Sequence, residues 1–162
     1  MMNTRKIYRN LMITFREAAP QDAATIVQLI AELATSIGER SSLTMAYVEK
    51  YLFYPGCKVL LAEVDGQTAG LLSYMIRPNL YHAGETCLIE EFVVRERARG
   101  QGIGSALLNE LISRMESLGC AEVSVSTMPD NVDALQFYKA HGLVDEAILL
   151  EKHLSGEGNG IP

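Results

Sequence analysis

The residues most suggestive of chemistry begin with a run of glycines. Residues 99–104 read Arg-Gly-Gln-Gly-Ile-Gly, between a stretch that resembles a strand and one that resembles a helix. Backbone N–H groups at a helix start have no partner within the helix, and the helix dipole adds partial positive charge there. Glycine also lets the backbone approach a ligand closely. The segment therefore predicts a phosphate or pyrophosphate site, with a tight turn that binds nothing as the alternative.

Two familiar phosphate loops do not fit this run. A Walker loop needs Gly-Lys-Ser/Thr at the helix start, and Gly104-Ser105-Ala106 lacks the lysine. A dinucleotide fingerprint needs glycine at Ser105 and an acidic residue at the end of the next strand, which instead ends at Ser126-Thr127. The sequence therefore disfavours a dinucleotide oxidoreductase and points to a different phosphate-bearing ligand.

A second group of residues shares one face of a predicted helix. Asn131, Ala134 and Tyr138 stand at positions i, i+3 and i+7. An amide, a small residue and a phenol in this order suit a long thin ligand. Taken singly, Asn131 is as readily a helix N-cap, and Tyr138 a packed aromatic ring.

Two adjacent glutamates interrupt an apolar strand at residues 86–95. Glu90 and Glu91 should face opposite sides of the sheet unless a bulge intervenes, because strand side chains alternate. Such a carboxylate can act as a general base directly or through water, attract a cationic substrate, or form a structural ion pair.

The periodicity of apolar residues predicts a single α/β domain at residues 12–154. Residues 1–11 form an N-terminal extension, Met12 is an alternative start, and residues 155–162 form a flexible tail. Tyr47, Tyr51 and Tyr54 share one side of a helix and suit core or interface packing, or else a pocket lining. Strands are predicted at 12–17, 58–64, 68–76, 86–95, 123–125 and 143–154, and helices at 20–38, 43–54, 102–118 and 131–142.

Composition narrows the classes of function. The chain has 162 residues, a net charge of -6 and a pI of about 5.1, which disfavours nucleic acid as a partner. The sequence shows no signal peptide and no apolar run long enough to cross a bilayer. We therefore expect a cytoplasmic protein without a membrane partner. The spacing of Cys57, Cys87 and Cys120 suits neither a zinc site nor a disulfide, so we expect reduced packing residues and no metal.

The two motifs together resemble those of a known family. Residues 99–104 fit [QR]xxGx[GA], and residues 131–143 fit NxxAxxFYxxxGF with Leu143 in place of the final aromatic. Over residues 13–154 the chain resembles the GNAT superfamily of acyl-CoA-dependent N-acetyltransferases. This resemblance implies a mixed, mostly antiparallel twisted sheet flanked by helices, with splayed central strands.

The resemblance also implies a co-substrate, acetyl-CoA, and a role for each site residue. Tyr138 would protonate the leaving thiolate, and Glu90 ranks before Glu91 as the base, because Ile89-Glu90-Glu91 resembles the Leu-Glu-Asp run of polyamine acetyltransferases. A bulge around Phe92–Val94 would offer an N–H to the acetyl carbonyl. The residues implied to contact the coenzyme are Phe92, Val93, Val94, Arg99, Gly100, Gln101, Gly102, Ile103, Gly104, Ser105, Asn131, Ala134 and Tyr138.

These observations predict an N-acetyltransferase that moves the acetyl group directly to a primary amine of a small molecule. The acceptor would be of the polyamine, aminoglycoside or aminoalkylphosphonate type. A non-catalytic acyl-CoA-binding module and a protein N-terminal acetyltransferase are the alternatives. A homodimer is usual among similar proteins. His82, in the loop after residues 68–76, is expected to be exposed without a role rather than a contact of the acceptor.

Overall fold

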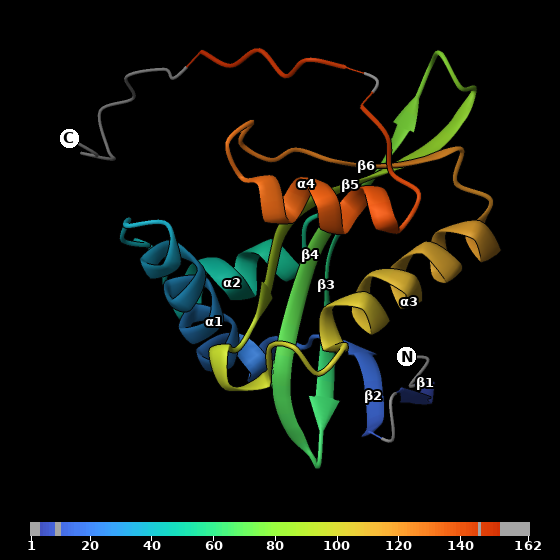
Figure 1. Cartoon of the computed structure of the whole chain (residues 1–162). Coiled ribbons are helices and arrows are strands. Elements are labelled where there is room, and N and C mark those ends of the chain that lie inside the picture. The colour runs from blue at the N-terminus through green and yellow to red at the C-terminus, as the bar shows by residue number, and fades with distance from the viewer. Residues whose placement is uncertain (1–3, 9–10, 146, 153–162) are drawn as a thin grey trace. The chain divides into compact units, whose positions relative to one another are not determined.

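The computed structural model describes residues 4–8, 11–145 and 147–152 (Figure 1). The predicted tail at 155–162 lies outside these residues. The chain divides into two compact units, an N-terminal unit of residues 1–127 and a C-terminal unit of residues 128–162, and each is described by itself.

The N-terminal unit contains a curled six-stranded sheet in the order β1-β2-β3-β4-β5-β6 (Figure 1). Neighbouring strands are antiparallel except β5 and β6, which are parallel. The predicted mixed, mostly antiparallel sheet is therefore confirmed. The strands are β1 (Thr4–Tyr8), β2 (Leu11–Glu17), β3 (Cys57–Val64), β4 (Gln67–Asn79), β5 (Gly84–Val94) and β6 (Glu122–Val125).

Helices cover both faces of this sheet (Figure 1). Helices α1 (Ala23–Ser36) and α2 (Met45–Leu52) lie on one face, where their apolar side chains form a core with alternate residues of β3, β4 and β5. Helix α3 (Ile103–Leu118) lies on the other face. Alternation along β3 explains the two-sided core, because both Leu60 and Leu61 are fully buried.

The β3–β4 hairpin forms where the sequence predicts it. Asp65 and Gly66 have φ angles of 50° and 75°, the left-handed conformation that a tight two-residue hairpin turn requires. Glycine adopts this conformation freely and aspartate tolerates it. This local turn sets the register that brings β4 beside β3.

Several predicted apolar stripes are only partly buried. Leu118 in the last turn of α3 is 61% exposed, and Tyr47 and Tyr54 on either side of the half-buried Tyr51 are 53% and 43% exposed. A helix buries only the turns that lie over the sheet, so spacing alone overestimates how far the core extends. The packing predicted for the tyrosines holds for Tyr51, which packs against the α1 and α2 core.

The expected strands do not include residues 4–8 of the N-terminal extension, yet these residues form a strand. They form β1, an edge strand that pairs with β2. An edge strand pairs with one neighbour only, and residues 5–7 of β1 are exposed. Its sequence therefore need not alternate apolar and polar residues. Lys6 of β1 forms an ion pair of 2.8 Å with Glu110 of α3, whose side chain is only 4% exposed.

In the C-terminal unit, helix α4 (Val132–Ala140) confirms the predicted helix. The last predicted strand, residues 143–154, is wrong for its described part, since residues 143–145 and 147–152 have no strand conformation. Val144, Ile148 and Leu150 are exposed there. Apolar β-branched residues favour a strand only where a neighbouring strand completes the hydrogen bonds, and the described part of this segment has none.

The ion pair between β1 and α3 predicts a measurable contribution to stability. Burial alone raises the pKa of Glu110, but hydrogen bonds from Lys6 and Arg114 outweigh it and hold the pKa below 4.5. Replacing Lys6 with alanine should therefore cost about 1–2 kcal/mol of unfolding free energy at pH 7, measured by urea denaturation. Because the folded pKa is lowered, this difference should shrink as the pH falls below 4.5.

Arg5→Ala, at an exposed position of the same strand, is the control and should change stability by less than about 0.5 kcal/mol. Equal effects of the two substitutions would show that the pair with Glu110 contributes nothing specific.

Candidate active site

The start of α3 has the backbone geometry of an anion site. Gly100 and Gly102 have φ angles of 73° and 83°, and Gly102 is the residue that precedes the helix. Hydrogen bonding from the first turn begins with Ala106 N–H, which donates to Gly102 O at 3.0 Å. The N–H groups of residues 103–105 are therefore not used by the helix ladder and suit an anionic group.

Side chains of the same loop hold it in shape. Arg99 donates from Nε to the carbonyl oxygen of Val94 at 3.0 Å, and Gln101 donates from Nε2 to Arg97 at 3.1 Å. Both predicted coenzyme contacts thus support the loop. Arg99 retains its terminal guanidinium N–H groups for a ligand.

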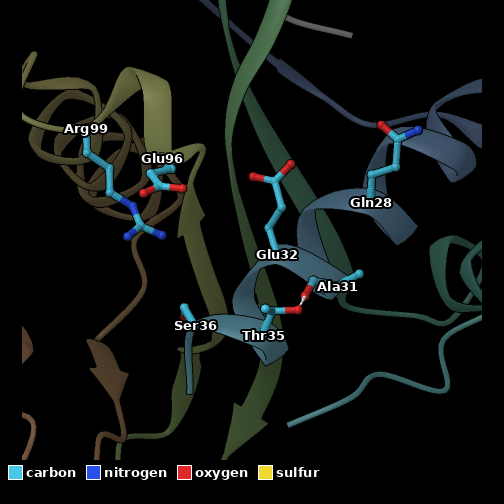
Figure 2. A pocket seen from close by; sticks show the side chains of 7 residues that line it. All are labelled: Gln28, Ala31, Glu32, Thr35, Ser36, Glu96 and Arg99. Atoms are coloured by element: carbon cyan, nitrogen blue, oxygen red, sulfur yellow. Dashed lines mark hydrogen bonds between the residues drawn. The ribbon is translucent and has the colours of Figure 1, made fainter. Parts of the chain in front are cut away.

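An open cavity of about 700 Å³ adjoins this loop (Figure 2). The guanidinium of Arg99 points into it from one side, and polar side chains of α1 line the other. Glu32 on that wall is paired with Arg95, which offsets its negative charge. The lining residues are Gln28, Ala31, Glu32, Thr35, Ser36, Glu96 and Arg99.

Sequence reasoning missed the α1 wall of this cavity. The polar face of α1 has the ordinary pattern of a solvated helix surface, so no signal separates Gln28 or Thr35 from any exposed residue. Only the approach of the loop before α3 turns this face into a lining.

A bulge in β5 places both predicted carboxylates on one face of the sheet. Phe92 pairs with Leu72, and Ile89 pairs with Tyr74, so Glu90 and Glu91 together stand opposite the single residue Ser73. Paired residues share a face, so Ile89 and Phe92 lie on the side of Leu72 and Tyr74. The two residues between them then face the other side, with Ser73, which is the side of α1 and α2.

Two expectations change with this bulge. Adjacent glutamates were expected on opposite faces unless a bulge intervened, and the bulge brings them to one face. The bulge was predicted around Phe92–Val94, but these residues pair regularly with β4, and the extra residue lies at Glu90–Glu91. The apolar pattern of β5 could not locate it, because a bulge is defined by the partner strand.

Ser73 binds one of the two carboxylates. Its hydroxyl accepts a hydrogen bond of 3.0 Å from Glu91 N–H and donates to Glu91 Oε2. Partial burial, followed by the neighbouring Glu91 carboxylate, raises the pKa of Glu90, whereas Arg77 acts in the opposite direction. The Glu91 carboxylate is therefore anchored by Ser73, and the pKa of Glu90 lies above its ordinary value.

Tyr51 of α2 adds a buried hydroxyl beside these carboxylates. Its oxygen has no hydrogen-bond partner among the described residues. Burial raises the pKa of Tyr51, and the Cys57 thiol and the carboxylates of Glu91 and Glu90 act in the same direction. Spacing offered a pocket lining as an alternative for Tyr51, but it could not pair this residue with the carboxylates, since α2 and β5 are far apart in the sequence.

Strand β5 extends beyond its neighbour β6. Pairing between them ends at Ile89 and Val125, where β6 itself ends, while β5 continues past the bulge to Val94. Phe92, Val93 and Val94 are the residues predicted to contact the coenzyme here. The side chain of Val93 is buried in the core that α1 covers. Val93 could therefore contribute only its backbone.

In the C-terminal unit, Asn131 is the N-cap of α4, and its Oδ1 accepts a hydrogen bond from Ala134 N–H at 3.2 Å. The N-cap interpretation is thus confirmed, and it leaves the Asn131 amide N–H₂ for other contacts. Tyr138 is half-buried and packs edge-on against Phe137. Burial raises the pKa of Tyr138, so its phenol is protonated at neutral pH.

Other predicted features can be placed briefly. All three cysteines are free, and Cys57 and Cys87 are buried. His82 is exposed and lies 3.1 Å from Glu122 of β6. Within the described residues, no cluster of three metal-ligating side chains occurs. No helix in this part of the chain is long and apolar enough to span a membrane.

A family model, the Acetyltransferase (GNAT) family, matches residues 24–143. The chain belongs to this family. Its match includes both the loop at the start of α3 and the motif on α4, so this GNAT protein is an N-acetyltransferase. The predicted family, fold and enzyme class are therefore confirmed.

Named relatives of this GNAT enzyme acetylate small molecules. L-2,4-Diaminobutyric acid acetyltransferase from Nocardia farcinica is 32% identical over 124 residues, which cover 75% of this chain and 61% of the relative. The chain thus matches less than two thirds of that protein. Aminoalkylphosphonate N-acetyltransferase from Salmonella typhimurium is 29% identical over 127 residues, which cover 78% and 82%. A crystal structure of a transcriptional regulator from Bacillus halodurans is similar with a TM-score of 0.77 and 28% identity, covering 88% of this chain and 99% of that one.

The loop of this GNAT acetyltransferase predicts the effect of a charge at position 102. Gly102→Asp should weaken coenzyme A binding at least about 100-fold in isothermal titration, because a carboxylate would repel the phosphates. Gly102→Asn is the matched control, since asparagine also tolerates the left-handed conformation but is uncharged, and it should bind far better. A folded Gly102→Asp protein with unchanged affinity would contradict the predicted phosphate site.

The pair on β5 predicts a shift that can be measured without substrate. Glu91→Gln removes the like charge beside Glu90, so the pKa of Glu90 should fall towards 4.5 but remain above it, because burial persists. Carboxyl carbon chemical shifts in an NMR titration would report this pKa. Glu85→Gln, at an exposed position of the same strand, should leave it unchanged. No shift in the Glu91→Gln protein would mean that the carboxylates are not neighbours.

Proposed function

We propose that the protein transfers the acetyl group of acetyl-CoA directly to a primary amine of a small molecule, of the polyamine, aminoglycoside or aminoalkylphosphonate type. The observation that carries this proposal is the bulge at Glu90–Glu91, since it sets two carboxylates on one face of the strand that leads into the α3 loop. A carboxylate pair suits a cationic amine, and the loop suits a phosphate-bearing donor.

The coenzyme would be held mainly through backbone groups. The N–H groups at Gly102–Ser105 and the guanidinium of Arg99 would bind the pyrophosphate, supported by Gly100 and Gln101. Backbone groups of Phe92–Val94 would bind the acyl end, where β5 has parted from β6. The amide N–H₂ of Asn131 would bind the pantetheine arm, and the small Ala134 would permit its close approach.

Glu90 would act as the base, directly or through a water molecule, and Glu91 as the second candidate. Two observations support this ranking: the Glu90 carboxylate has a raised pKa, and the Glu91 carboxylate is already bonded to Ser73. An ammonium group must lose a proton before its nitrogen can attack the thioester carbon. A base with a raised pKa accepts this proton more readily than an ordinary glutamate does.

Tyr138 would supply the proton that the departing sulfur needs. As the new C–N bond forms and the C–S bond breaks, the phenol would donate to the thiolate and later recover a proton from solvent. Its raised pKa supports this role only in part, because it keeps the phenol protonated but also makes it a weaker acid. The hydrogen bond to sulfur, rather than full proton transfer, would then carry much of the effect.

The assay that tests the function measures thiol release from acetyl-CoA. Amines to be compared are spermidine, an aminoglycoside, 2-aminoethylphosphonate and a peptide with an unblocked N-terminus. We expect turnover with a small amine and little with the peptide. Coenzyme A binding without turnover of any small amine would contradict the proposal, and preference for the peptide would favour the protein N-terminal alternative.

The role of Tyr138 predicts a selective loss of rate. Tyr138→Phe should lower kcat about 100-fold or more while leaving acetyl-CoA affinity nearly unchanged, measured by steady-state kinetics and titration. Activity that requires the phenol should be lost only as the pH rises above 10, because burial raises this pKa. Tyr81→Phe removes the hydroxyl of a tyrosine that is 92% exposed and serves as the control. Full activity of the Tyr138→Phe enzyme would exclude the proposed proton donor.

A further inference from the structure

The basic side chain of Arg77 lies on the same face of the sheet as the two carboxylates. Arg77 lies on β4 four residues after Ser73, so the two side chains point to the same side. Its β5 partner is Thr86, four residues before Glu90. At about 3.3 Å per residue, the Cα atoms of Arg77 and Ser73 lie about 13 Å apart along the strand. The long side chains of Arg77 and of the two glutamates opposite Ser73 can shorten the distance between their charged groups.

The charge of Arg77 is not used by the fold. Arg16, Arg95 and Arg114 form ion pairs in this unit, whereas Arg77 is exposed and forms no ion pair among the residues that the structure describes. It is nevertheless close enough to Glu90 to lower the pKa of that carboxyl group. A positive charge therefore lies near the carboxylates without being neutralised by them.

Resting on the proposed function, we infer that the acceptor carries an acidic group close to its reacting amine, and that Arg77 binds this group. Glu90 and Glu91 attract the ammonium end, and the Arg77 guanidinium matches a carboxylate or phosphonate with its fork of N–H donors. A purely cationic amine would meet a repulsive charge at the same place. The inference thus selects amino acids and aminoalkylphosphonates over polyamines and aminoglycosides.

Two matched pairs of acceptors isolate the acidic group. 2,4-Diaminobutyrate differs from 1,3-diaminopropane only by its carboxylate, and 2-aminoethylphosphonate differs from ethylamine only by its phosphonate. We expect kcat/KM to be about 10-fold or more higher for the acidic member of at least one pair. The pair that shows the preference identifies the acid as a carboxylate or a phosphonate.

Arg77→Gln should abolish this preference by raising KM for the acidic acceptor, with little change in kcat. The ratio within each pair is the readout, because any effect of the substitution on Glu90 acts on both members alike. Arg77→Lys should retain part of the preference, since the charge remains while the planar fork is lost. Arg5→Gln, an exposed arginine on β1, is the control and should leave the ratio unchanged.

A binding measurement that needs no turnover can distinguish failure of this inference from failure of the proposed function. Titration of 2-aminoethylphosphonate and 2,4-diaminobutyrate into the protein with coenzyme A present should show binding that weakens in Arg77→Gln. If turnover occurs but neither pair shows a preference, or if Arg77→Gln weakens both members equally, the inference is wrong and the proposed function stands. If the acidic amines bind through Arg77 but are never acetylated, the proposed function fails instead. If neither acidic amine binds, the inference is also wrong.

Discussion

The site depends on a constraint of strand geometry: successive side chains of a strand point to opposite faces. Glu90 and Glu91 can act on the same substrate only because β5 has one residue more than β4 at Ser73. Past the same point β5 leaves β6, so the bulge lies where backbone groups of β5 lose a neighbouring strand. The bulge therefore accounts for the carboxylate pair, and it lies next to the point where the pairing of β5 with β6 has ended.

The same strand leads directly into the loop before α3, which is the proposed phosphate site. Residues 84–105 run from β5 through a short 3₁₀ helix, Glu96–Ala98, to the start of α3. Two contacts hold the middle of this segment: the Val93 side chain is buried in the core with α1, and Arg99 Nε donates to the Val94 carbonyl oxygen. A donor held at the loop and an acceptor held at the bulge would thus be positioned by one continuous stretch of chain.

The titrating groups are tuned in ways that suit opposite tasks. Partial burial and a like charge raise the pKa of Glu90, which makes it a better base. Burial raises the pKa of Tyr138, which keeps the phenol protonated, as the proposed proton donor requires. By contrast, the buried Glu110 is held charged by Lys6 and Arg114 and joins the edge strand to α3. A partly buried glutamate can therefore have a raised or a lowered pKa, depending on which charged partners the fold places beside it.

The sequence by itself determined the features that arise within a few residues. The turn at Asp65–Gly66, the left-handed glycine before α3 and the cap at Asn131 follow from local backbone preference and short-range hydrogen bonds. The family, most of the strands and the four helices could be predicted for the same reason. The motifs and apolar periods that define them lie within single segments.

Only the tertiary structure decided which distant residues meet. The position of the bulge required β4, the placement of Tyr51 beside the carboxylates required α2 to cover the sheet, and the cavity wall required α1 to face the loop. The β1 strand and the absence of a strand in residues 147–152 likewise depended on whether a pairing neighbour was at hand. Such contacts join segments that are remote in the chain, so they leave no spacing in the sequence by which they could be recognised.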